Sequence, residues 1–433
     1  MKKKLYVRTY GCQMNAYDSV RIKQMLSQDY EETDTTLDAD LIIINTCSVR
    51  KKPEEKLFAV LGTLKPLKQK NKNLIIGVGG CVAQQYGSEI IKRVPHVDFV
   101  FGTHNLSLIP EFIKDSQCAN NVKVDYREKW EDLPVTNPYN GALSISVAIS
   151  RGCNNRCAYC IVPQTRGPEV SRPSSQIIDE ISLSVEQGTK EVLLLGQCVN
   201  SYGSDLEEDI TFEKLLDKIS KINGLERIRF TSPHPKHITD EFIDLVCSNP
   251  KICRHVHLPL QAGSNRILEL MNRKYTKEHY LEIIEKIRRK VPDMAFTTDI
   301  IVGFPTETES DFLETVGVVE KVGFVNSYSF VYSPRPNTKS LELKDDISYS
   351  EKLGWLNFLQ DRQYEVSARV LKDFIGKTTS ILVDGYSKKD KTCLKGTNSQ
   401  NITVNLSKDY SNVKLGSIID VEVKDISRLT LKA

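Results

Sequence analysis

Three cysteines lie close together in the segment RGCNNRCAYCIVP, at Cys153, Cys157 and Cys160. A structural zinc ion normally takes four protein ligands, and no fourth cysteine or histidine stands nearby in the sequence. Three thiolates can instead hold three irons of a 4Fe-4S cluster and leave the fourth iron open to a non-protein ligand. The alternative is a zinc site completed by a distant histidine.

Three further cysteines recur in the N-terminal part of the chain, where Cys12, Cys47 and Cys81 are 35 and 34 residues apart. Each ends an apolar run, and these runs are KLYVRTYGC, DLIIINTC and LIIGVGGC. Such runs predict parallel strands, whose carboxyl ends meet at one edge of a sheet, where ligands bind. We therefore expect these thiols to converge and to hold a second cluster that also has one open iron. The alternative is three unrelated buried thiols, because free cysteine packs well in a core.

The elements that position these cysteines alternate between strand and helix. Helical patterns such as DSVRIKQMLSQ and KPEEKLFAVLGTLKPLKQK follow the apolar runs, so residues 1–118 predict an α/β domain with a parallel sheet. Residues 119–140 contain two prolines and little periodicity, which is typical of a linker.

A second series of strands and helices occupies residues 141–371. Its six strand candidates are LSISVAIS, KEVLLLGQ, LERIRFTSP, CRHVHLPLQ, MAFTTDIIVGFP and FVNSYSFVYSP. Helical segments separate them, which predicts an incomplete (β/α)6 barrel. Residues 372–433 change to short strands with Gly and Asp/Asn turns, as expected of a small β-barrel. The expected fold class is α/β with this barrel appended.

The chain has eleven cysteines among 433 residues, a number that needs an explanation. We expect no signal peptide and no membrane span, because the N-terminus lacks an apolar core segment and no apolar run approaches about 18 residues. The expected location is therefore the cytoplasm, where clustered cysteines are metal ligands or catalytic thiols. Four cysteines without partners at ligand spacing are expected to be structural: Cys118, Cys247, Cys253 and Cys393.

The spacing of Cys153, Cys157 and Cys160 resembles that of the radical S-adenosylmethionine (SAM) superfamily. The resemblance implies that SAM binds the open iron through its amino and carboxylate groups, with Tyr159 packed near the adenine. Because ligand sites in βα barrels lie at the C-terminal ends of strands, we expect the loops there to form the SAM pocket. The predicted pocket residues are Gly196, Gln197, Ser232, Gln261 and Gly303, although each loop alone is also typical of an ordinary connection.

Nearly the whole chain resembles the methylthiotransferases. The resemblance is carried by YGCQMNAYDS, NTCSVR, GGCVAQ, RGCNNRCAYCIVP, SRP, RFTSPHP, HLPLQAGSN, TTDIIVGFPTETESDF and FVYSPRPNT. It implies two 4Fe-4S clusters and SAM, with one SAM methylating a sulfur at the auxiliary cluster and a second SAM supplying radical chemistry. The C-terminal barrel resembles a TRAM domain, which implies RNA binding.

Gln13-Met14-Asn15 after Cys12 is the form found in the branch that acts on N6-(dimethylallyl)adenosine of tRNA. This branch would attach a methylthio group to C2 of that base, next to the anticodon. Two alternatives remain open from the sequence. One is a sister methylthiotransferase acting on threonylcarbamoyl adenosine of tRNA or on a ribosomal-protein aspartate. The other is a non-enzymatic iron–sulfur protein that binds RNA and senses iron or redox state.

Four residues depart from the family pattern. Cys198 stands in place of Asn, Ala262 in place of Ser, Thr306 in place of Gly and Asn337 in place of Gly. Asn tolerates the left-handed conformation that Gly serves, so the last change is mild. We expect the changes at 262 and 306 to adjust the SAM pocket without removing a ligand, and Cys198 not to bind a cluster.

Positive charge is concentrated in the C-terminal part. Residues 372–433 hold 11 Lys+Arg against 7 Asp+Glu, whereas the whole chain has a net charge of +3. Contact with tRNA phosphates is therefore expected at Lys377, Lys388, Lys389, Lys391 and Lys395, although ordinary surface lysines would look the same. The other expected partners are an electron donor such as flavodoxin or ferredoxin and the iron–sulfur assembly proteins. We expect the chain to be monomeric.

Overall fold

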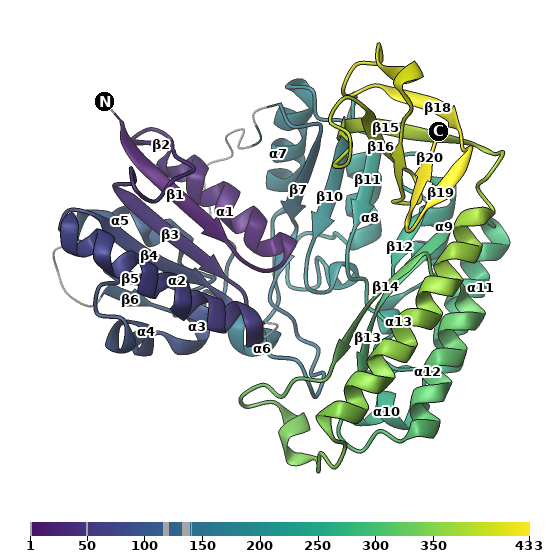
Figure 1. The fold of residues 1–433 in the computed structure, drawn as a ribbon, viewed down its shortest axis with the longest axis horizontal. Helices are drawn as coiled ribbons and strands as arrows, with labels where there is room; N and C mark the ends of the chain where they lie inside the picture. The colour runs from purple at the N-terminus through teal and green to yellow at the C-terminus, as the bar shows by residue number, and fades with distance from the viewer. Residues whose placement is uncertain (1, 49–50, 116–120, 132–138, 140) are drawn as a thin grey trace.

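The structure of this protein is a computed structural model that describes residues 2–48, 51–115, 121–131, 139 and 141–433, with the side chains of 51–54 excepted. The chain forms an N-terminal sheet with helices on both faces, a central curved row of strands and a C-terminal curled sheet (Figure 1). The N-terminal sheet and the C-terminal sheet lie on either side of the first central strands. This architecture confirms the expected α/β fold class.

The N-terminal sheet is parallel throughout, with strand order β2-β1-β3-β4-β5-β6. Its strands are β1 (Lys3–Thr9), β2 (Tyr30–Glu32), β3 (Leu41–Thr46), β4 (Ile75–Gly80), β5 (Phe99–Phe101) and β6 (Asn121–Lys123). All six residues of β3 are buried, as a central parallel strand requires. The three predicted strands form as expected. Strand β6 lies within the stretch predicted as a linker, where it pairs with β5 as an edge strand.

Helices cover both faces of this sheet. They are α1 (Gln13–Leu26), α2 (Lys51–Lys70), α3 (Cys81–Tyr86), α4 (Ser88–Arg93) and α5 (Ile109–Lys114), with a 3-10 turn η1 (Leu106–Leu108). Ile22 and Leu26 of α1 pack with Phe112 of α5 on one face. Leu57 and Leu61 of α2 pack on the other face with residues of α3 and α4. The domain is therefore a three-layer structure with one core on each side of the sheet.

The central part contains all six predicted strands. These are β7 (Ser144–Ala148), β10 (Glu191–Leu195), β11 (Arg227–Phe230), β12 (His255–His257), β13 (Ala295–Val302) and β14 (Asn326–Val331). They form two parallel sheets, β11-β10-β7 and β12-β13-β14, which a single bridge between Ile228 and Ile252 connects. Strands β7 and β14 form the two ends of this row, so the barrel is incomplete, as predicted.

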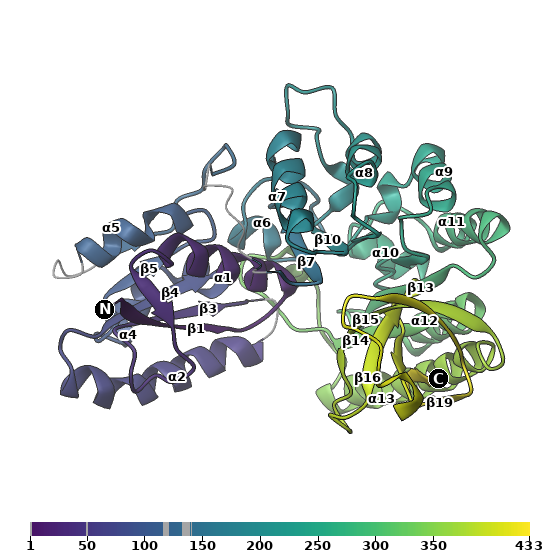
Figure 2. The same cartoon turned by 90° about the horizontal axis from the view of Figure 1, so that it is seen from above.

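The helices of the central part follow one another around the outside of the strands (Figure 2). They are α6 (Val162–Thr165), α7 (Ser174–Glu186), α8 (Phe212–Ser220), α9 (Asp240–Ser248), α10 (Asn265–Leu270), α11 (Lys277–Lys290), α12 (Glu309–Val322) and α13 (Tyr349–Lys372). Threonine side chains cap the N-termini of α8, α9, α11 and α12 by accepting a backbone N–H. Short elements connect the rest: β8 (Ser150–Arg151), β9 (Val170–Ser171), η2 (Val199–Ser201), η3 (Pro235–His237) and η4 (Lys339–Glu342).

The C-terminal part is a six-stranded curled sheet of order β18-β15-β16-β17-β20-β19. Its elements are β15 (Thr378–Tyr386), β16 (Leu394–Asn398), β17 (Thr403–Asn405), η5 (Lys408–Tyr410), β18 (Ile418–Glu422), β19 (Asp425–Ser427) and β20 (Thr430–Lys432). Residues 416–427 hold two of the expected short strands, β18 and β19. The curled sheet is consistent with a small barrel. In the part of the chain that the structure describes, no helix is both long and apolar enough to cross a membrane.

Candidate functional site

The three N-terminal cysteines lie at one edge of the N-terminal sheet. Strands β1, β3 and β4 are neighbours and parallel, and a cysteine follows the carboxyl end of each. Cys12 precedes the first residue of α1, Cys47 directly follows β3, and Cys81 is the first residue of α3. All three line one cavity. The structure therefore brings together the thiols that the strand pattern predicted to converge.

Close backbone packing holds these thiols near one another. Gly11 has a φ of +120°, and a Cβ there would lie 2.1 Å from the Cβ of Cys47. A hydrogen bond with the Cys47 thiol lowers the pKa of Cys12 to about 5, and the charge of Arg166 acts in the same direction. Burial raises the pKa of Cys81, which the Arg166 guanidinium opposes. A side chain at position 11 would separate Cys12 from Cys47, so this glycine is needed by the site.

The second triplet lies in the loop between β8 and α6. The backbone N–H of Cys160 donates to the Cys157 carbonyl at 3.1 Å, and the N–H of Cys153 donates to the Gly167 carbonyl at 3.1 Å. These two bonds fold the loop so that the thiols interact. Burial, followed by the neighbouring Cys157, raises the pKa of Cys160 to about 12. Burial also raises the pKa of Cys153.

The thiols of both triplets are the type of donor that holds a 4Fe-4S cluster. Among the described residues, no three His, Cys, Asp or Glu side chains surround one ion position. In a 4Fe-4S cluster each thiolate binds its own iron, so three thiols need not point at one atom. Buried thiols that resist ionisation become thiolates when a cation binds them, which links metal binding to loss of their protons. Cys81, Cys153 and Cys160 have this character, whereas the lowered pKa of Cys12 already favours its thiolate.

Arginine side chains lie against both triplets. Nη1 of Arg273 donates to Sγ of Cys157 at 3.2 Å, and Arg273 is buried. Arg166, which follows the second triplet in sequence, crosses to the first triplet and interacts with Cys12 and Cys81. A guanidinium cannot lose its proton in a protein, so each triplet has a permanent positive neighbour that favours a bound anionic cluster.

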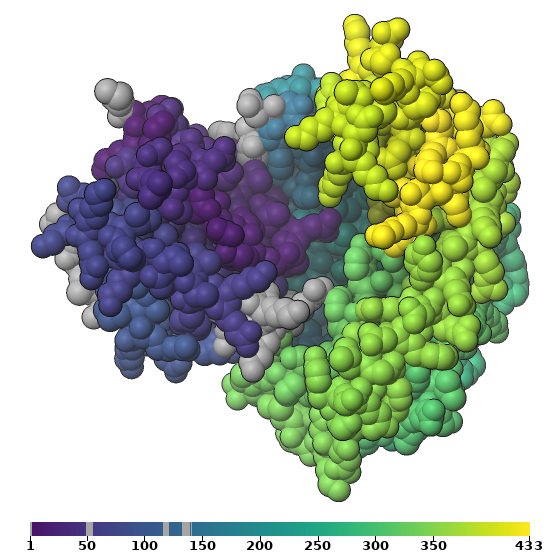
Figure 3. All heavy atoms as spheres, viewed as in Figure 1, coloured from purple at the N-terminus to yellow at the C-terminus, as the bar shows by residue number. Residues whose placement is uncertain are grey.

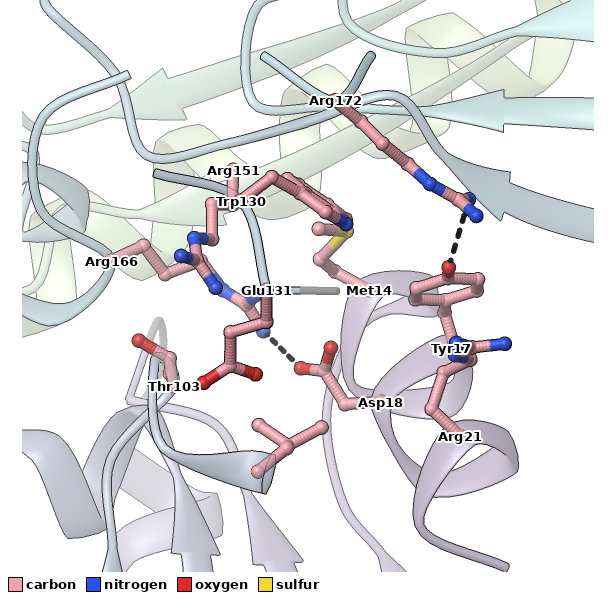
Figure 4. A pocket seen from close by; sticks show the side chains of 11 residues that line it. Met14, Tyr17, Asp18, Arg21, Thr103, Trp130, Glu131, Arg151, Arg166 and Arg172 are labelled. Atoms are coloured by element: carbon pink, nitrogen blue, oxygen red, sulfur yellow. Dashed lines mark hydrogen bonds and ion pairs between the residues drawn. The ribbon is translucent and has the colours of Figure 1, made fainter. Parts of the chain in front are cut away.

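Arg166 also attaches the second triplet's loop to α1. Its Nη2 donates to Oδ2 of Asp18 at 3.0 Å (Figure 4). The same nitrogen donates to Oδ1 of Asn15 at 2.8 Å. A second arginine, Arg172, donates to the hydroxyl of Tyr17 at 3.3 Å and pairs with buried Glu180. Helix α1 begins directly after Cys12, so two buried arginines of the central part hold the helix that carries one of the first thiols.

The cavity of about 900 Å³ extends from the N-terminal cysteines into the barrel and to the C-terminal sheet. Figure 3 shows the hollow between these parts. From the predicted SAM pocket, Gly196, Gln197 and Ser232 line the cavity. Oε1 of Gln197 is buried without a hydrogen-bond partner in the described structure. An orphaned buried acceptor costs stability unless a ligand satisfies it, which fits SAM at this position.

The other predicted SAM residues lie close to the barrel but not on this cavity wall. Tyr159 packs against the central core, and burial raises its pKa. Gln261 has a φ value of 71°, a left-handed conformation that occurs often at ligand sites, and Ser232 on the cavity wall has a φ of 57°. A Cβ at Gly303, where φ is +71°, would lie 2.4 Å from Lys352, so this glycine serves packing against α13.

The four residues that depart from the family pattern differ in backbone conformation and in their surroundings. Asn337 has a φ of 56°, which its side-chain type tolerates, whereas Thr306 adopts a φ of 69° although its side chain is β-branched. Arg266 holds Thr306 by donating to its carbonyl at 2.7 Å. Cys198 is buried and hydrogen-bonds Asn200 at 3.5 Å. Ala262 is fully buried in the core.

Most of the tail lysines predicted to contact RNA are exposed. Lys377, Lys388, Lys389 and Lys391 are exposed. Lys395 is half-buried and pairs with Asp384 at 2.9 Å, so it is less available than the others.

Among the remaining cysteines, Cys253 is buried, while Cys247 and Cys393 are half-buried; Cys118 lies outside the described residues. His255 and His257 both line the cavity. One ring nitrogen of each forms a hydrogen bond with the hydroxyl of Thr297.

Comparison with known proteins places this chain. Residues 147–319 match the Radical SAM superfamily, and residues 4–102 match the family described as Uncharacterized protein family UPF0004. A tRNA-2-methylthio-N(6)-dimethylallyladenosine synthase of Thermoanaerobacter pseudethanolicus is 44% identical, covering 99% of this chain and 91% of that protein. The enzyme of that name in Geobacter metallireducens is 45% identical, covering 98% and 96%.

The chain belongs to the tRNA-2-methylthio-N(6)-dimethylallyladenosine synthase family. The similar solved structures share little sequence identity with this chain, so they show only its fold. The radical SAM methyltransferase TsrM from Kitasatospora setae superposes with a TM-score of 0.59 at 13% identity, covering 78% of this chain and 77% of that one. The cobalamin-dependent radical SAM enzyme OxsB gives a TM-score of 0.54 at 13% identity, with 84% and 58% covered. The match at 147–319 includes Cys153, Cys157 and Cys160. The match at 4–102 includes Cys12, Cys47 and Cys81.

Proposed function

We propose that this protein attaches a methylthio group to C2 of N6-(dimethylallyl)adenosine next to the anticodon of tRNA. The observation that carries the proposal is the near full-length similarity to synthases named for this product, together with a cysteine triplet that faces the cavity. Family membership makes the protein a radical SAM enzyme. The sulfur chemistry would depend on the N-terminal triplet of Cys12, Cys47 and Cys81, since a radical SAM core alone has no sulfur to insert.

Each triplet has a separate role in the proposal. Cys153, Cys157 and Cys160 would hold a 4Fe-4S cluster with SAM, and Cys12, Cys47 and Cys81 an auxiliary 4Fe-4S cluster. When bound, these groups supply one-electron cleavage of SAM and a sulfur atom for transfer. The protein's own side chains orient and neutralise them.

Arg273 donates to the thiol of Cys157 and Arg166 stands beside the first triplet, so both clusters would have a fixed cationic neighbour. A preorganised charge of this kind costs no reorganisation during reaction. Gln197 has an unused buried acceptor in the wall of the cavity and would take a donor of SAM.

The RNA would be bound by the C-terminal sheet, with the base turned out of the anticodon-loop stack into the cavity. Exposed Lys377, Lys388, Lys389 and Lys391 support phosphate contacts, and a TRAM-like role fits this part of the chain. We also infer a cytoplasmic monomer that takes electrons from a flavodoxin or ferredoxin and clusters from assembly proteins. The domain boundaries proposed are 1–118 with β6 added as its edge strand, a linker in the rest of 119–140, then 141–371 and 372–433.

Nucleoside analysis of tRNA from a deletion strain tests this function. The strain should accumulate N6-(dimethylallyl)adenosine and lose its 2-methylthio derivative, and the gene on a plasmid should restore it. A plasmid carrying Cys157→Ala should not. Unchanged 2-methylthio-N6-(dimethylallyl)adenosine would rule out the proposal, and loss of a methylthio group from threonylcarbamoyl adenosine or from a ribosomal-protein aspartate would assign the enzyme to a sister branch.

A further inference from the structure

The cavity wall contains two large apolar side chains that remain exposed. Most of the residues around them are polar, among them Ser232, Asp299 and Asn401. Tyr328 of β14 is 52% exposed and Leu429 of the β19–β20 turn is 40% exposed, and both line the cavity. The other large hydrophobic side chains found exposed in the described structure lie elsewhere. These two are therefore available to a ligand inside the cavity.

Tyr328 offers an aromatic surface. Its ring stands edge-on to His257, with centroids 6.1 Å apart and an angle of 65° between the planes. His257 is in turn held by the hydroxyl of Thr297 at 3.0 Å. The contact with His257 orients the ring, and about half of the Tyr328 side chain remains exposed. Aromatic side chains held in this way are the usual partners of unstacked bases in RNA recognition.

Leu429 stands at the tip of a tight hairpin. Ser427 pairs with Thr430, so Arg428 and Leu429 are the two turn residues, and Arg428 has a φ of 52°. Such positions favour Gly, Asn and Asp, and an exposed leucine there contributes nothing to the turn. Ile402 from the neighbouring β16–β17 turn lines the same cavity. The C-terminal sheet thus contributes an apolar tip to the cavity.

We propose that Tyr328 and Leu429 form the subsite for the modified base, with Tyr328 stacking on the purine and Leu429 packing on the branched alkyl chain at N6. This subsite rests on the proposed function, because it assumes the dimethylallyl adenine as ligand. The five-carbon alkyl chain is the one large apolar group that distinguishes this nucleotide from its neighbours. An aliphatic side chain recognises such a group by removing it from water.

The Leu429→Ala variant tests the alkyl contact. The anaerobically prepared holoenzyme is titrated with two anticodon stem-loops, one with N6-(dimethylallyl)adenosine and one with adenosine. The preference of the wild-type protein for the first RNA should fall roughly fivefold in Leu429→Ala. Leu415→Ala, which removes an equally exposed leucine of the same sheet that does not line the cavity, should keep the full preference. An unchanged preference in Leu429→Ala overturns the alkyl contact.

The Tyr328→Ala variant tests the stacking contact. Both RNAs should bind about tenfold more weakly, because stacking does not depend on the N6 group, and Tyr328→Phe should bind like the wild type. Tyr364→Ala removes a tyrosine of the same exposure on α13 and should change nothing. SAM cleavage without RNA should be unaffected by Tyr328→Ala. Its loss would assign the ring to SAM and overturn the proposal.

Failure of the subsite and failure of the proposed function give different results. If the wild-type holoenzyme methylthiolates the stem-loop and Leu429→Ala keeps the preference, the function stands and the subsite is wrong. If the wild type shows neither a preference for the dimethylallyl RNA nor a methylthiolated product, the proposed function is wrong and the subsite falls with it.

Discussion

At the level of single residues, arginines set the charge around the two groups of thiols. Arg273 donates to Cys157, and Arg166 lies beside Cys12 and Cys81. Both guanidinium groups are buried, so water does not screen them effectively. The clusters proposed for the two sites should therefore be bound in a fixed and positively charged environment.

Removing one thiol of the first triplet should separate the two activities. In Cys47→Ala the methylthiolation of tRNA is expected to stop while SAM cleavage to 5′-deoxyadenosine continues, because the second triplet is intact. Iron in the anaerobically purified protein should fall from about eight to about four per chain. Cys253→Ala, a change at an equally buried cysteine, should keep both activities and all iron. Loss of SAM cleavage in Cys47→Ala would contradict separable clusters.

His104 should make stability fall in mild acid. Its Nε2 donates to the Arg166 carbonyl at 2.7 Å and its Nδ1 accepts the Arg127 N–H at 3.1 Å, which requires the neutral ring. Burial and the charge of Arg151 lower the pKa of His104 to about 4. The unfolded chain binds this proton near pH 6.5, so stability should be lost as the pH falls from about 6.5 towards 4, on the order of 1–3 kcal/mol.

Thermal unfolding of wild type and His104→Gln across this pH range measures the effect. Glutamine can make both hydrogen bonds and does not titrate. The two proteins should unfold at similar temperatures at pH 7.5, and the variant should lose less stability on acidification. Parallel curves would show that another group causes the acid sensitivity.

The convergence of Cys12, Cys47 and Cys81 could be predicted because their positions after strands are visible in the sequence. Arg166 and Arg273 could not, since each is a single arginine in a segment without a pattern, and their contacts with thiols arise only in the folded chain. The positive φ of Thr306 could not be predicted either, because a threonine in the sequence gives no indication of that backbone conformation. Leu429 was missed because a leucine in a short loop resembles ordinary core.

At the level of secondary-structure elements, α1 connects the two sites. In the first turns of α1, Asp18 accepts from Arg166 and Tyr17 accepts from Arg172 (Figure 4). Arg172 also pairs with Glu180 of α7, and Arg166 donates to Asn15 of α1. The helix begins after Cys12, so its position sets where this thiol lies relative to the barrel. A shift of α1 would therefore move the two triplets relative to each other.

Breaking the Arg172 pair should destabilise the protein strongly. In Arg172→Met the carboxylate of Glu180 stays buried without its cation, which typically costs about 3–5 kcal/mol. Adding Glu180→Gln should restore much of the loss by removing the unpaired charge. Arg289→Met, which breaks the exposed pair with Glu285, should change stability by less than about 1 kcal/mol. Urea unfolding of the three variants measures this, and similar losses in all three would contradict the account.

The long elements could be predicted and the short ones could not. Strands β3 and β4 and helix α13 have enough residues for a clear apolar pattern. Strands β5, β6 and β20 have three residues each, too few for any period to show. The residues of β6 were expected to be part of a linker, because a strand at the edge of a sheet needs few apolar residues and shows no clear strand pattern. The division between β18 and β19 depends on packing with β15 and β20.

At the level of the whole molecule, the C-terminal sheet is fastened to the barrel. Arg227 donates to the Thr397 and Ser380 carbonyls, and Arg229 donates to those of Ser399 and Asn398. The sheet therefore stands over β11 with its turns at the cavity. Two arginines without any pattern around them contribute to this arrangement, together with contacts such as Gln400 with Asp293, so it could not be predicted from the sequence.

The exposed tail lysines should contribute charge to RNA binding. Changing Lys388, Lys389 and Lys391 together to Ala should weaken binding of any anticodon stem-loop and reduce the slope of log K against log salt by about 2 to 3. Changing Lys286, Arg289 and Lys290 on α11 to Ala removes the same charge elsewhere and should leave the slope unchanged. Fluorescence anisotropy at several salt concentrations measures both. An equal effect of the two sets would show that the tail is not the RNA contact.

The most direct measurement is nucleoside mass spectrometry after reaction of the anaerobically reconstituted protein with SAM, a reductant and tRNA containing N6-(dimethylallyl)adenosine. The account predicts that this nucleoside gains one CH2S unit and becomes its 2-methylthio derivative. The reaction should also release 5′-deoxyadenosine and S-adenosylhomocysteine. Cleavage of SAM with the dimethylallyl nucleoside unchanged would contradict the account.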